Sequence, residues 1–534
     1  MSPTTTVDAV VIGSGPNGLV AANALVDAGW DVLILEAQDT IGGAVRTAEV
    51  TAPGFANDLF SAFYPLAAAS PVIKDLHLEN HGLQWVQPQD VLAHALDDGR
   101  AAVLSTDPQR TAQSMDSFAA GDGQAWLDMF AHWQRIRDPL LDALFTPFPP
   151  VKSALSLLRR LGTSGTIDLA RLAVLPVRRL AEENFRGEGA GLLLTGNALH
   201  SDLGPDAAGS GVFGWLLAML GQDVGFPVPR GGAGNLAHAM QHRFVSKGGQ
   251  VRTGMQVTGI DITSGRATGA RCADGTVVRA TRAVLADVSA PSLYRDLVGL
   301  DRLPSGIRRE IDRFQWDYGT LKVNWALDRP VPWRAAGARH AGTVHLGVDA
   351  NGFVDYAADL TCGRLPRKPF VLFGQMTTAD PSRSPEGTES AWAYTHVPHG
   401  PRWTTEQMER HALRVQDEIE LLAPGFSASV LAKHIQTPDG LEAADANIVQ
   451  GGTNGGTAGI HQQLFFRPIP GTGRPETPVA GLYLASASAH PGGGVHGACG
   501  WNAALAALGA NSKVGAVRRR LNSTAWSRLL PSGK

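Results

Sequence analysis

Cysteine is scarce in this sequence, and long apolar runs are missing from it. The three cysteines, Cys272, Cys362 and Cys499, lie far apart and form no Cys-x-x-Cys pair. This excludes a redox dithiol and a thiolate zinc site, and it fits a reducing compartment. No run of about eighteen apolar residues is present to cross a bilayer, and residues 1–6 are polar and leave no room for a signal peptide. We therefore predict no metal site and a cytoplasmic protein, either soluble or attached to a membrane surface.

Charge of either sign is also sparse. Charged residues make up 18% of the chain and the formal net charge is −3, so no basic field points to a nucleic-acid partner. Hydrophobic residues make up 44%, which is typical of a globular protein rather than a disordered one. With 534 residues the chain is too long for one ordinary core, so we expect two domains or more.

The beginning of the chain carries the strongest positive signal. Short apolar strands are predicted at residues 7–11 and 31–35, with a helix over 19–28 between them. The first strand runs into a G-x-G-x-x-G turn that consists of Gly13, Ser14, Gly15, Pro16, Asn17 and Gly18. The second strand ends at Glu36. Strand, glycine turn, helix, strand and acid follow in the order of a dinucleotide-binding βαβ unit.

Each position of this unit has a physical role. Gly13 permits the tight turn, Gly15 lets the backbone approach a pyrophosphate, and Gly18 lets the helix and the strand pack closely. The phosphates then lie at the helix N-terminus, where free N–H groups and the helix dipole favour an anion. The carboxylate of Glu36 can accept hydrogen bonds from both ribose hydroxyls.

A second glycine pair distinguishes between dinucleotides. Ala37 begins the short segment that leads from Glu36 to Gly42 and Gly43. This extension resembles the glutathione-reductase-like FAD proteins, and the resemblance implies that the glycine pair lies under the same pyrophosphate. The first arginine after the pair is Arg46, which is a candidate phosphate contact. The predicted cofactor is FAD.

The remainder of the chain predicts an interleaved organisation. We expect an α/β fold in which a glutathione-reductase-like Rossmann FAD domain is interleaved with an α+β substrate domain that carries a helical lid. The FAD domain is predicted to comprise residues 1–75, 222–300 and 467–515. The substrate domain is predicted to comprise a helical lid region over 76–221 and a sheet over 301–466, and residues 516–534 form a basic tail.

Local patterns support these divisions. Two hairpin turns predict a three-strand meander over residues 255–285, in which the backbone at Val257 is expected beside the adenine. Strands of the substrate sheet are predicted at 314–328 and 370–378. The glycine-rich residues 447–459 follow no strand, so we expect a loop there rather than a second nucleotide site.

Residues 140–180 allow two interpretations. Apolar helical faces in this region are bordered by several arginines, as in helices that lie in a membrane interface. The same pattern fits a helical lid over a substrate channel, with the arginines in water. We favour the lid because each predicted helix is short.

The chain ends with another strand, glycine turn and helix. A strand over 479–489 leads into glycines and then into a helix over 502–508. Such a turn can direct N–H groups at the N1–C2=O edge of the flavin, where negative charge gathers on reduction. The candidate flavin contacts in this segment are Ser486, Gly493, Gly494, Val495 and His496.

Motifs near this end resemble the phytoene-desaturase-like FAD oxidoreductases. They are Arg467-Pro468, Thr477-Pro478, the Gly-Leu-Tyr-Leu run at 481–484, and His490-Pro491-Gly492-Gly493-Gly494. The chain is most similar to the branch of pyridine nucleotide-disulfide oxidoreductase domain proteins, over nearly its whole length. The resemblance implies a two-part flavoprotein, non-covalent FAD and a lipophilic substrate such as a polyene or an isoprenoid.

These observations favour a dehydrogenase or desaturase. We expect hydride transfer from an unactivated or allylic C–H to flavin N5, with the cofactor supplying the chemistry. His490 and His496 are the candidate acid–base residues because histidine titrates near neutrality, although each also fits a structural role in the loop. Cys499 is expected to be a buried helix residue rather than a covalent flavin link.

Several features stay open. Because FAD takes up the single nucleotide fingerprint, the expected electron acceptor is oxygen or a membrane quinone. The alternatives are an amine or aldehyde oxidase on the same scaffold and a non-catalytic FAD-binding protein that acts through a partner. The tail from Lys513 carries Arg518, Arg519 and Arg520 without an acid, and we expect it to be attracted to anionic lipid.

Overall fold

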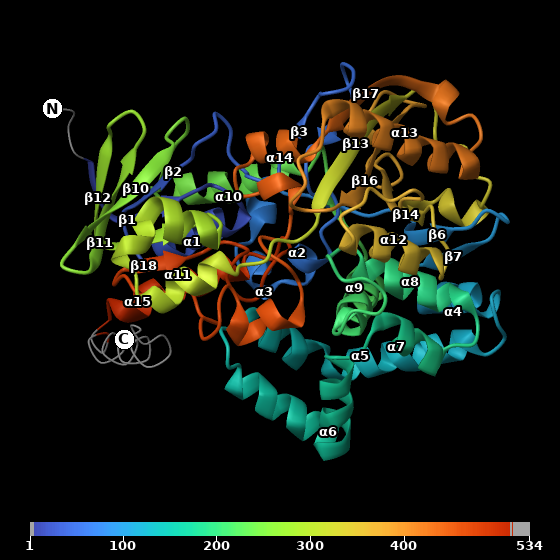
Figure 1. The fold of residues 1–534 in the computed structure, drawn as a ribbon, viewed down its shortest axis with the longest axis horizontal. Coiled ribbons are helices and arrows are strands. Elements are labelled where there is room, and N and C mark those ends of the chain that lie inside the picture. The colour runs from blue at the N-terminus through green and yellow to red at the C-terminus, as the bar shows by residue number, and fades with distance from the viewer. Residues whose placement is uncertain (1–4, 513–514, 516–534) are drawn as a thin grey trace.

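The computed structural model describes residues 5–512 and residue 515. Two mixed sheets lie at opposite ends of the molecule, and a layer of helices packs against the second one (Figure 1). The predicted basic tail over 516–534 lies outside the described residues.

The first sheet contains the nucleotide-binding strands. Its order is β10-β11-β12-β1-β2-β9, and β18 pairs with β12 off this path. The strands are β1 (Thr5–Ile12), β2 (Val32–Leu35), β9 (Gln250–Arg252), β10 (Val257–Thr263), β11 (Arg266–Cys272), β12 (Val277–Ala286) and β18 (Leu482–Leu484). Strands β12, β1, β2 and β9 run parallel and are buried on both faces, which explains their valine- and leucine-rich sequences. The meander forms as predicted, as β10 to β12.

Three helices from distant parts of the chain cover one face of this sheet. They are α1 (Pro16–Asp27), α10 (Gly234–Ser246) and α15 (Ala498–Ala510), which bury their alanines and leucines in one core (Figure 1). Helix α15 crosses α1 so closely that a Cβ atom at Gly500 would lie 1.9 Å from the carbonyl oxygen of Asn17. Only glycine fits there, and the contact brings the two ends of the chain together.

The second sheet has the order β17-β13-β16-β15-β14-β6-β7. Its strands are β6 (Asp90–Ala95), β7 (Ala101–Leu104), β13 (Gly319–Leu327), β14 (Ala341–Leu346), β15 (Val371–Gln375), β16 (Glu389–Val397) and β17 (Val430–Gln436). Helix α13 (Thr405–Leu422) begins with a capping box formed by Thr404 and Gln407 and packs on the outer face. The two strands predicted at 314–328 and 370–378 are β13 and β15, whereas β6 and β7 join this sheet from the region predicted to be helical.

The helical layer follows β7. It consists of α4 (Pro108–Asp116), α5 (Asp122–Phe145), α6 (Val151–Leu172), α7 (Val177–Asn184), α8 (Glu188–Ala198) and α9 (Ser210–Val224). Buried Trp126, Trp133 and Trp215 pack at its centre. Helix α6 is longer than the sequence suggested, with 22 residues, and it is broken at Gly162, whose φ is 65°. Among the described residues, no helix has the length and apolarity to cross a membrane.

Shorter elements complete the chain. They are β3 (Thr47–Ala48), β4 (Asn57–Asp58), β5 (Trp85–Val86), β8 (Val228–Pro229), α2 (Pro65–Ala69), α3 (Pro71–Lys74), α11 (Ser305–Asp312), α12 (Gly352–Thr361) and α14 (Pro438–Ala444).

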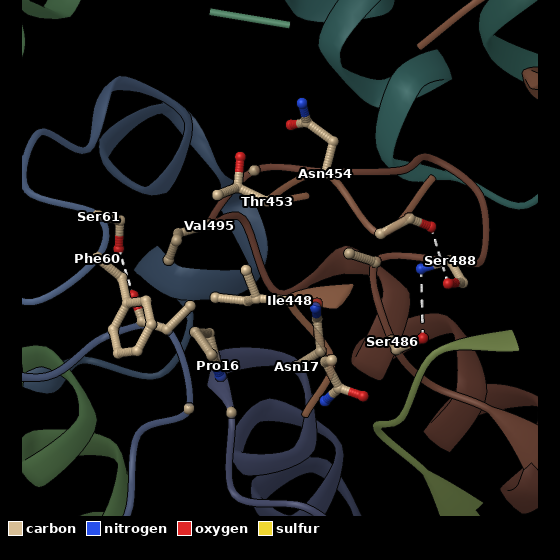
Figure 2. Close-up of a pocket in the computed structure, with 18 of the residues that line it drawn as sticks. Pro16, Asn17, Phe60, Ser61, Ile448, Thr453, Asn454, Ser486, Ser488 and Val495 are labelled. Atoms are coloured by element: carbon tan, nitrogen blue, oxygen red, sulfur yellow. Dashed lines mark hydrogen bonds between the residues drawn. The ribbon is translucent and has the colours of Figure 1, made fainter. Parts of the chain in front are cut away.

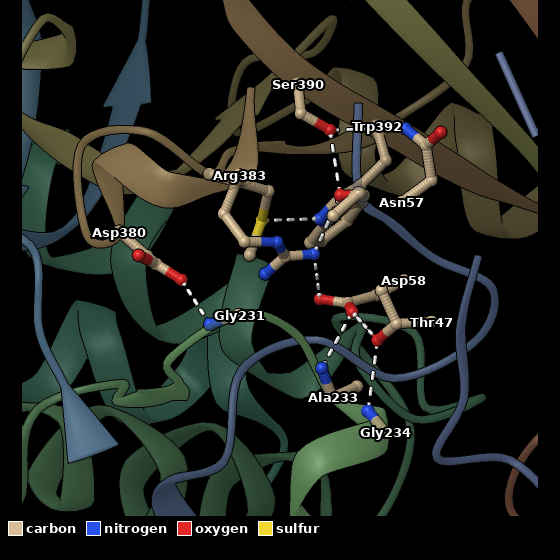
Figure 3. A network of polar contacts seen from close by, with 12 residues as sticks. Thr47, Asn57, Asp58, Gly231, Ala233, Gly234, Asp380, Arg383, Ser390 and Trp392 are labelled. Carbon is tan, nitrogen blue, oxygen red and sulfur yellow. Dashed lines mark hydrogen bonds and ion pairs between the residues drawn. The ribbon is translucent and has the colours of Figure 1, made fainter. Parts of the chain in front are cut away.

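A buried ion pair joins the segment after the nucleotide fold to the second sheet (Figure 3). One guanidinium nitrogen (Nη2) of Arg383 lies 2.9 Å from Oδ2 of Asp58, and both side chains are fully buried. Oδ1 of Asp58 accepts hydrogen bonds from the Ala233 N–H at 2.8 Å and from the Thr47 hydroxyl at 2.7 Å. The Arg383 guanidinium also donates to the Ala56 carbonyl. This network fixes the start of α10 and the second sheet to the same carboxylate.

We expect Arg383→Met to destabilise the protein by about 3–5 kcal/mol, because it leaves a buried carboxylate without its counter-charge. The matched control is Arg402→Met, since Arg402 faces Asp439 at 3.9 Å on the surface and is 79% exposed. Urea denaturation followed by tryptophan fluorescence measures both variants. Equal midpoints for the two would contradict a stabilising role for the buried pair.

Candidate active site

A single large cavity lies where the two sheets and the helical layer meet. Its volume is about 870 Å³. The glycine turn after β1 and the loop before α15 border it from opposite ends of the chain, and Figure 2 shows Pro16, Asn17 and Val495 around it. The cavity extends from this nucleotide end to the inner face of the second sheet.

Glu36 is held in place by the glycine turn itself. Its Oε2 accepts hydrogen bonds from the backbone N–H of Ser14 at 2.8 Å and from the Ser14 hydroxyl at 2.6 Å. Its Oε1 accepts a bond from the N–H of Gln38 at 2.9 Å. The carboxylate lines the cavity with acceptor capacity left over, which is what a ribose diol requires.

Asp287 is a site residue that the sequence analysis missed. It follows β12, and its Oδ2 accepts a hydrogen bond from the Gly18 N–H at 2.8 Å. A Cβ atom at Gly15 would lie 2.7 Å from this oxygen, so the turn excludes a side chain there even without a bound nucleotide. Burial raises the pKa of the Asp287 carboxyl to about 7, and the charges of Asp445 and Glu36 add to the rise. The available signal was its position, because β12 and β1 are parallel neighbours whose carboxyl ends meet at one edge.

Most of the predicted cofactor residues line this cavity. They are Gly13, Ser14, Gly15, Pro16, Asn17, Glu36, Ala37, Gly43, Val257, Ser486, Gly493, Gly494, Val495 and His496. Gly18, Gly42 and Arg46 are not among the lining residues. The structure therefore brings the predicted residues from both ends of the chain to one space.

Gly42 and Arg46 support the turn from behind. The Gly42 N–H donates to the Ser14 carbonyl at 3.1 Å. The Arg46 guanidinium donates to the carbonyls of Gly43 at 2.9 Å and of Ala444 at 2.7 Å, and it lies over the Phe60 ring. Arg46 thus ties the second glycine pair to the end of α14.

The loop at 447–459 belongs to the site, although it was expected only to be a loop. Ile448, Thr453 and Asn454 line the cavity beside Ser486 and Ser488 (Figure 2). The fully buried Arg467 guanidinium donates to the carbonyls of Asn454, Thr457 and Ala487. This arginine joins the 454–457 loop to the loop after β18. Its position in the Arg467-Pro468 motif was visible in the sequence, but its partners were not.

The two candidate histidines have backbone partners. Nδ1 of His496 accepts a bond from the Ala498 N–H at 3.0 Å, so Nε2 carries the proton and donates to the Gly492 carbonyl at 3.3 Å. Nε2 of His490 donates to the Thr146 carbonyl at 3.1 Å. Burial lowers the pKa of each imidazole to about 4. Both rings are therefore neutral at pH 7, and they shape the loop that faces the cavity.

Cys499 is buried in α15, as expected. Its thiol lies 3.5 Å from the Ala489 carbonyl and 3.6 Å from the Gly492 carbonyl, and burial raises its pKa to about 12. It is not among the cavity-lining residues.

Lys322 is a second site residue that the sequence analysis missed. It lies in the middle of β13, is 3% exposed, and lines the cavity. Its Nζ donates to the carbonyls of Asp58 and Phe60 and lies 5.3 Å from the Trp392 ring centroid. Burial lowers its pKa to about 7. A single lysine between Leu321 and Val323 in an apolar strand was the signal available in the sequence.

The remaining wall is apolar and comes from the helical layer. Its side chains belong to α5 and α9 and to the residue that follows α9 by two: Leu140, Leu144, Val212, Phe213, Leu216, Leu217, Leu220 and Phe226. The four carboxylates among the described lining residues are Glu36, Asp287, Asp296 and Asp445, and they lie around the glycine turn or on the short helix that packs on β10. The cavity is thus polar and acidic at one end and apolar along its helical side.

The donor set fits FAD. Glu36 supplies ribose acceptors, and the close packing at Gly15 leaves backbone as the surface a pyrophosphate would meet. Two buried atoms of lining residues, Oδ1 of Asn17 and Nδ2 of Asn454, have no hydrogen-bond partner among the described residues. Buried polar atoms are nearly always paired, so a polar ligand is expected beside them.

Comparison with known proteins agrees with this chemistry. Residues 17–506 match the family described as flavin containing amine oxidoreductase. The chain belongs to this family. It is an FAD-dependent oxidoreductase, which answers the alternative of a non-catalytic FAD-binding protein.

Relatives span almost the whole chain. Pyridine nucleotide-disulfide oxidoreductase domain-containing protein 2 of Mus musculus is 30% identical, over 93% of this chain and 92% of its own. One of the limonene dehydrogenase polypeptides of Castellaniella defragrans is 24% identical, over 94% and 95%. The predicted resemblance to this branch and to the phytoene desaturases is confirmed.

Solved structures share the fold. An oxidoreductase from Methanosarcina mazei matches with a TM-score of 0.64 at 16% identity, covering 94% of this chain and 99% of its own. Putrescine oxidase with bound putrescine matches with a TM-score of 0.60 at 15% identity, covering 95% and 99%. At this identity the likeness shows the fold alone.

Asp287 makes FAD affinity depend on pH. Its carboxyl is neutral below about pH 7 and charged above it, where it repels the pyrophosphate. We expect the Kd for FAD to rise about tenfold between pH 6 and pH 8. Asp287→Asn keeps the acceptor for the Gly18 N–H and is expected to give a nearly constant Kd. Titration of apoprotein with FAD, followed by quenching of flavin fluorescence, measures this; parallel pH profiles for the two proteins would refute it.

Lys322 makes stability depend on pH in the opposite direction. Its pKa is about 7 in the folded protein, against an ordinary value of 10.5, so between these values the unfolded chain holds a proton that the folded one lacks. Stability from this group therefore rises with pH across the window, by at most about tenfold in the unfolding constant per pH unit. We expect Lys322→Met to lose this rise in thermal unfolding scans between pH 7 and 10. Lys433→Met, at an exposed position of β17, is the control and should keep it.

Proposed function

We propose that the protein is a dehydrogenase or desaturase that transfers hydride from a C–H bond of a lipophilic, polyene- or isoprenoid-like substrate to FAD, which oxygen or a quinone reoxidises. One observation carries the proposal: the nucleotide end and the apolar wall of α5 and α9 belong to the same cavity. A substrate held on that wall shares an enclosed space with whatever the glycine turn binds.

The bound flavin would supply hydride acceptance at N5, and the protein supplies position and dryness. Glu36 and the turn at 13–18 would hold the ribose and the pyrophosphate. Arg467 and His496 fix the loops that border the cavity, through bonds to backbone carbonyls. The leucine and phenylalanine side chains of α9 exclude water from the substrate side.

The relatives support a lipophilic substrate. Their names include limonene dehydrogenase, 4,4'-diapolycopene oxygenase and phytoene desaturase. All three names refer to isoprenoid compounds. The two histidines give no support to a dedicated acid or base, because both are neutral and bonded to backbone.

An amine or aldehyde oxidase is the second candidate. It is favoured by the family description and by the polar side chains that the second sheet directs into the cavity, Lys322 among them. A cationic amine is less well matched, since the described carboxylates of the cavity lie at its nucleotide end.

The helical layer bears on both earlier interpretations of residues 140–180. Leu140 and Leu144 of α5 line the cavity, which supports a lid. Helix α6 carries four exposed apolar side chains, Val151, Leu155, Leu158 and Ile167, which support attachment to a membrane surface where a quinone and a lipophilic substrate dissolve.

Anaerobic titration of the FAD-loaded protein tests the proposal. We expect an isoprenoid such as limonene or geraniol to bleach the flavin absorption near roughly 450 nm, whereas putrescine does not. Leu216→Arg in the apolar wall should abolish bleaching by the isoprenoid and leave reduction by dithionite intact. Leu421→Arg, at an exposed position of α13, is the control. Bleaching by amines alone would select the oxidase, and bleaching by dithionite alone would overturn the proposal.

A further inference from the structure

The two faces of the second sheet differ in chemistry. Side chains alternate between the faces along each strand. On β13, Leu321 and Val323 point to the apolar core beneath α13, whereas Thr320 and Lys322 line the cavity. The cavity face continues across the sheet through the lining residues Tyr394 and Thr343. A cavity built for a pure hydrocarbon would not need this polar face.

Two polar atoms on this side of the cavity have no partner. Oδ1 of Asn197 and Oγ1 of Thr343 are buried without a hydrogen bond to any described residue, and both residues line the cavity. The two residues are 2% and 1% exposed. Nδ2 of Asn197 donates to the Leu193 carbonyl at 2.9 Å, which fixes the amide with its oxygen toward the unfilled side. An unpaired buried polar atom costs free energy, so these atoms indicate a partner that is not part of the chain.

A pair of histidines adds a donor at the same place. Nε2 of His200 lies 3.0 Å from Nε2 of His345, and burial lowers the pKa of both rings, so the pair is neutral and shares one hydrogen bond. Nδ1 of His345 is buried without a partner among the described residues. A buried bare nitrogen costs less than a buried unpaired N–H, so His345 donates from Nε2. His200, which lines the cavity, then carries its own proton on Nδ1.

These groups lie far from the nucleotide end. Strand register places Lys322 opposite Tyr394, Tyr394 opposite Leu372, and Leu372 opposite His345. Three strand spacings separate Lys322 from His345, or about 14 Å. We call the cluster of Asn197, His200 and Thr343 the distal polar site.

We infer that the distal polar site binds a neutral oxygen function, a hydroxyl or a carbonyl, at the end of the substrate remote from the reacting carbon. An acceptor on Asn197, a hydroxyl on Thr343 and a donor on His200 match a group that can accept and donate hydrogen bonds. The cluster offers no charged side chain, so a carboxylate or an ammonium group would be buried there without a counter-ion. This inference rests on the proposed function and specifies its substrate class: an oxygenated lipophile rather than a bare hydrocarbon.

Titration calorimetry on the FAD-loaded protein with 1-decanol, 1-chlorodecane, decanoate and decylamine tests the inference. We expect 1-decanol to bind about tenfold more tightly than 1-chlorodecane, which has a similar chain but cannot donate a hydrogen bond. The two charged probes should bind more weakly than 1-decanol. Asn197→Leu should weaken 1-decanol about tenfold and leave 1-chlorodecane unchanged.

Asn184→Leu is the matched control. The Asn184 amide donates to the Leu180 carbonyl at 2.8 Å, four residues earlier, as Asn197 does to Leu193, but Asn184 is exposed on α7. It should leave every probe unchanged. Equal affinity for 1-decanol and 1-chlorodecane, tighter binding of a charged probe, or equal losses for both neutral probes in Asn197→Leu would overturn the inference. Because calorimetry needs no turnover, a protein that binds 1-decanol as expected but is never reduced by an isoprenoid would contradict the proposed function and not the distal polar site.

Discussion

The buried contact between Asp58 and Arg383 is the constraint on which the site depends. Neither side chain reaches water, and each already has further bonds to backbone atoms of a different segment. A charge in such a place cannot be solvated if its partner moves, so the nucleotide-binding part and the second sheet are held at one separation. The cavity is the space that this separation leaves. Lys322, which donates to the Asp58 carbonyl, extends the same junction to the cavity wall.

The ends of the chain impose a second constraint. Helix α15 rests on α1 at Gly500, and the loop before α15 therefore borders the cavity near the turn that begins α1. His496 and Arg467 fill their hydrogen-bonding groups with backbone partners, which keeps this loop in one conformation. Polar groups that remain unpaired among the described residues lie on the cavity side, at Asn17 and Asn454 near the nucleotide end and at Asn197 and Thr343 near the distal end. The site is thus rigid where it holds itself together and unsatisfied where it faces a ligand.

Local sequence patterns predicted the parts of the fold that are local. The first βαβ unit, the meander and the strands β13 and β15 follow from periodicity and turn residues within about thirty residues of one another. The pairing of β6 with β14 places Asp90 opposite Ala341, and no local pattern encodes a contact between segments so far apart. Asp287 and Lys322 were missed for the same reason, since each acquires its role from a backbone segment elsewhere in the chain. His490 and His496 were placed correctly beside the cavity, but their partners could not be read from composition.

The central claim is that one cavity holds the flavin and the substrate face to face between the two sheets. A crystal structure of the FAD-loaded protein measures this directly. The account predicts an isoalloxazine ring between the loop at 486–496 and the Lys322 face of the second sheet, with the wall of α9 open to a ligand on its other side. A ring that lies outside this space, or a wall separated from it by protein side chains, would contradict the account.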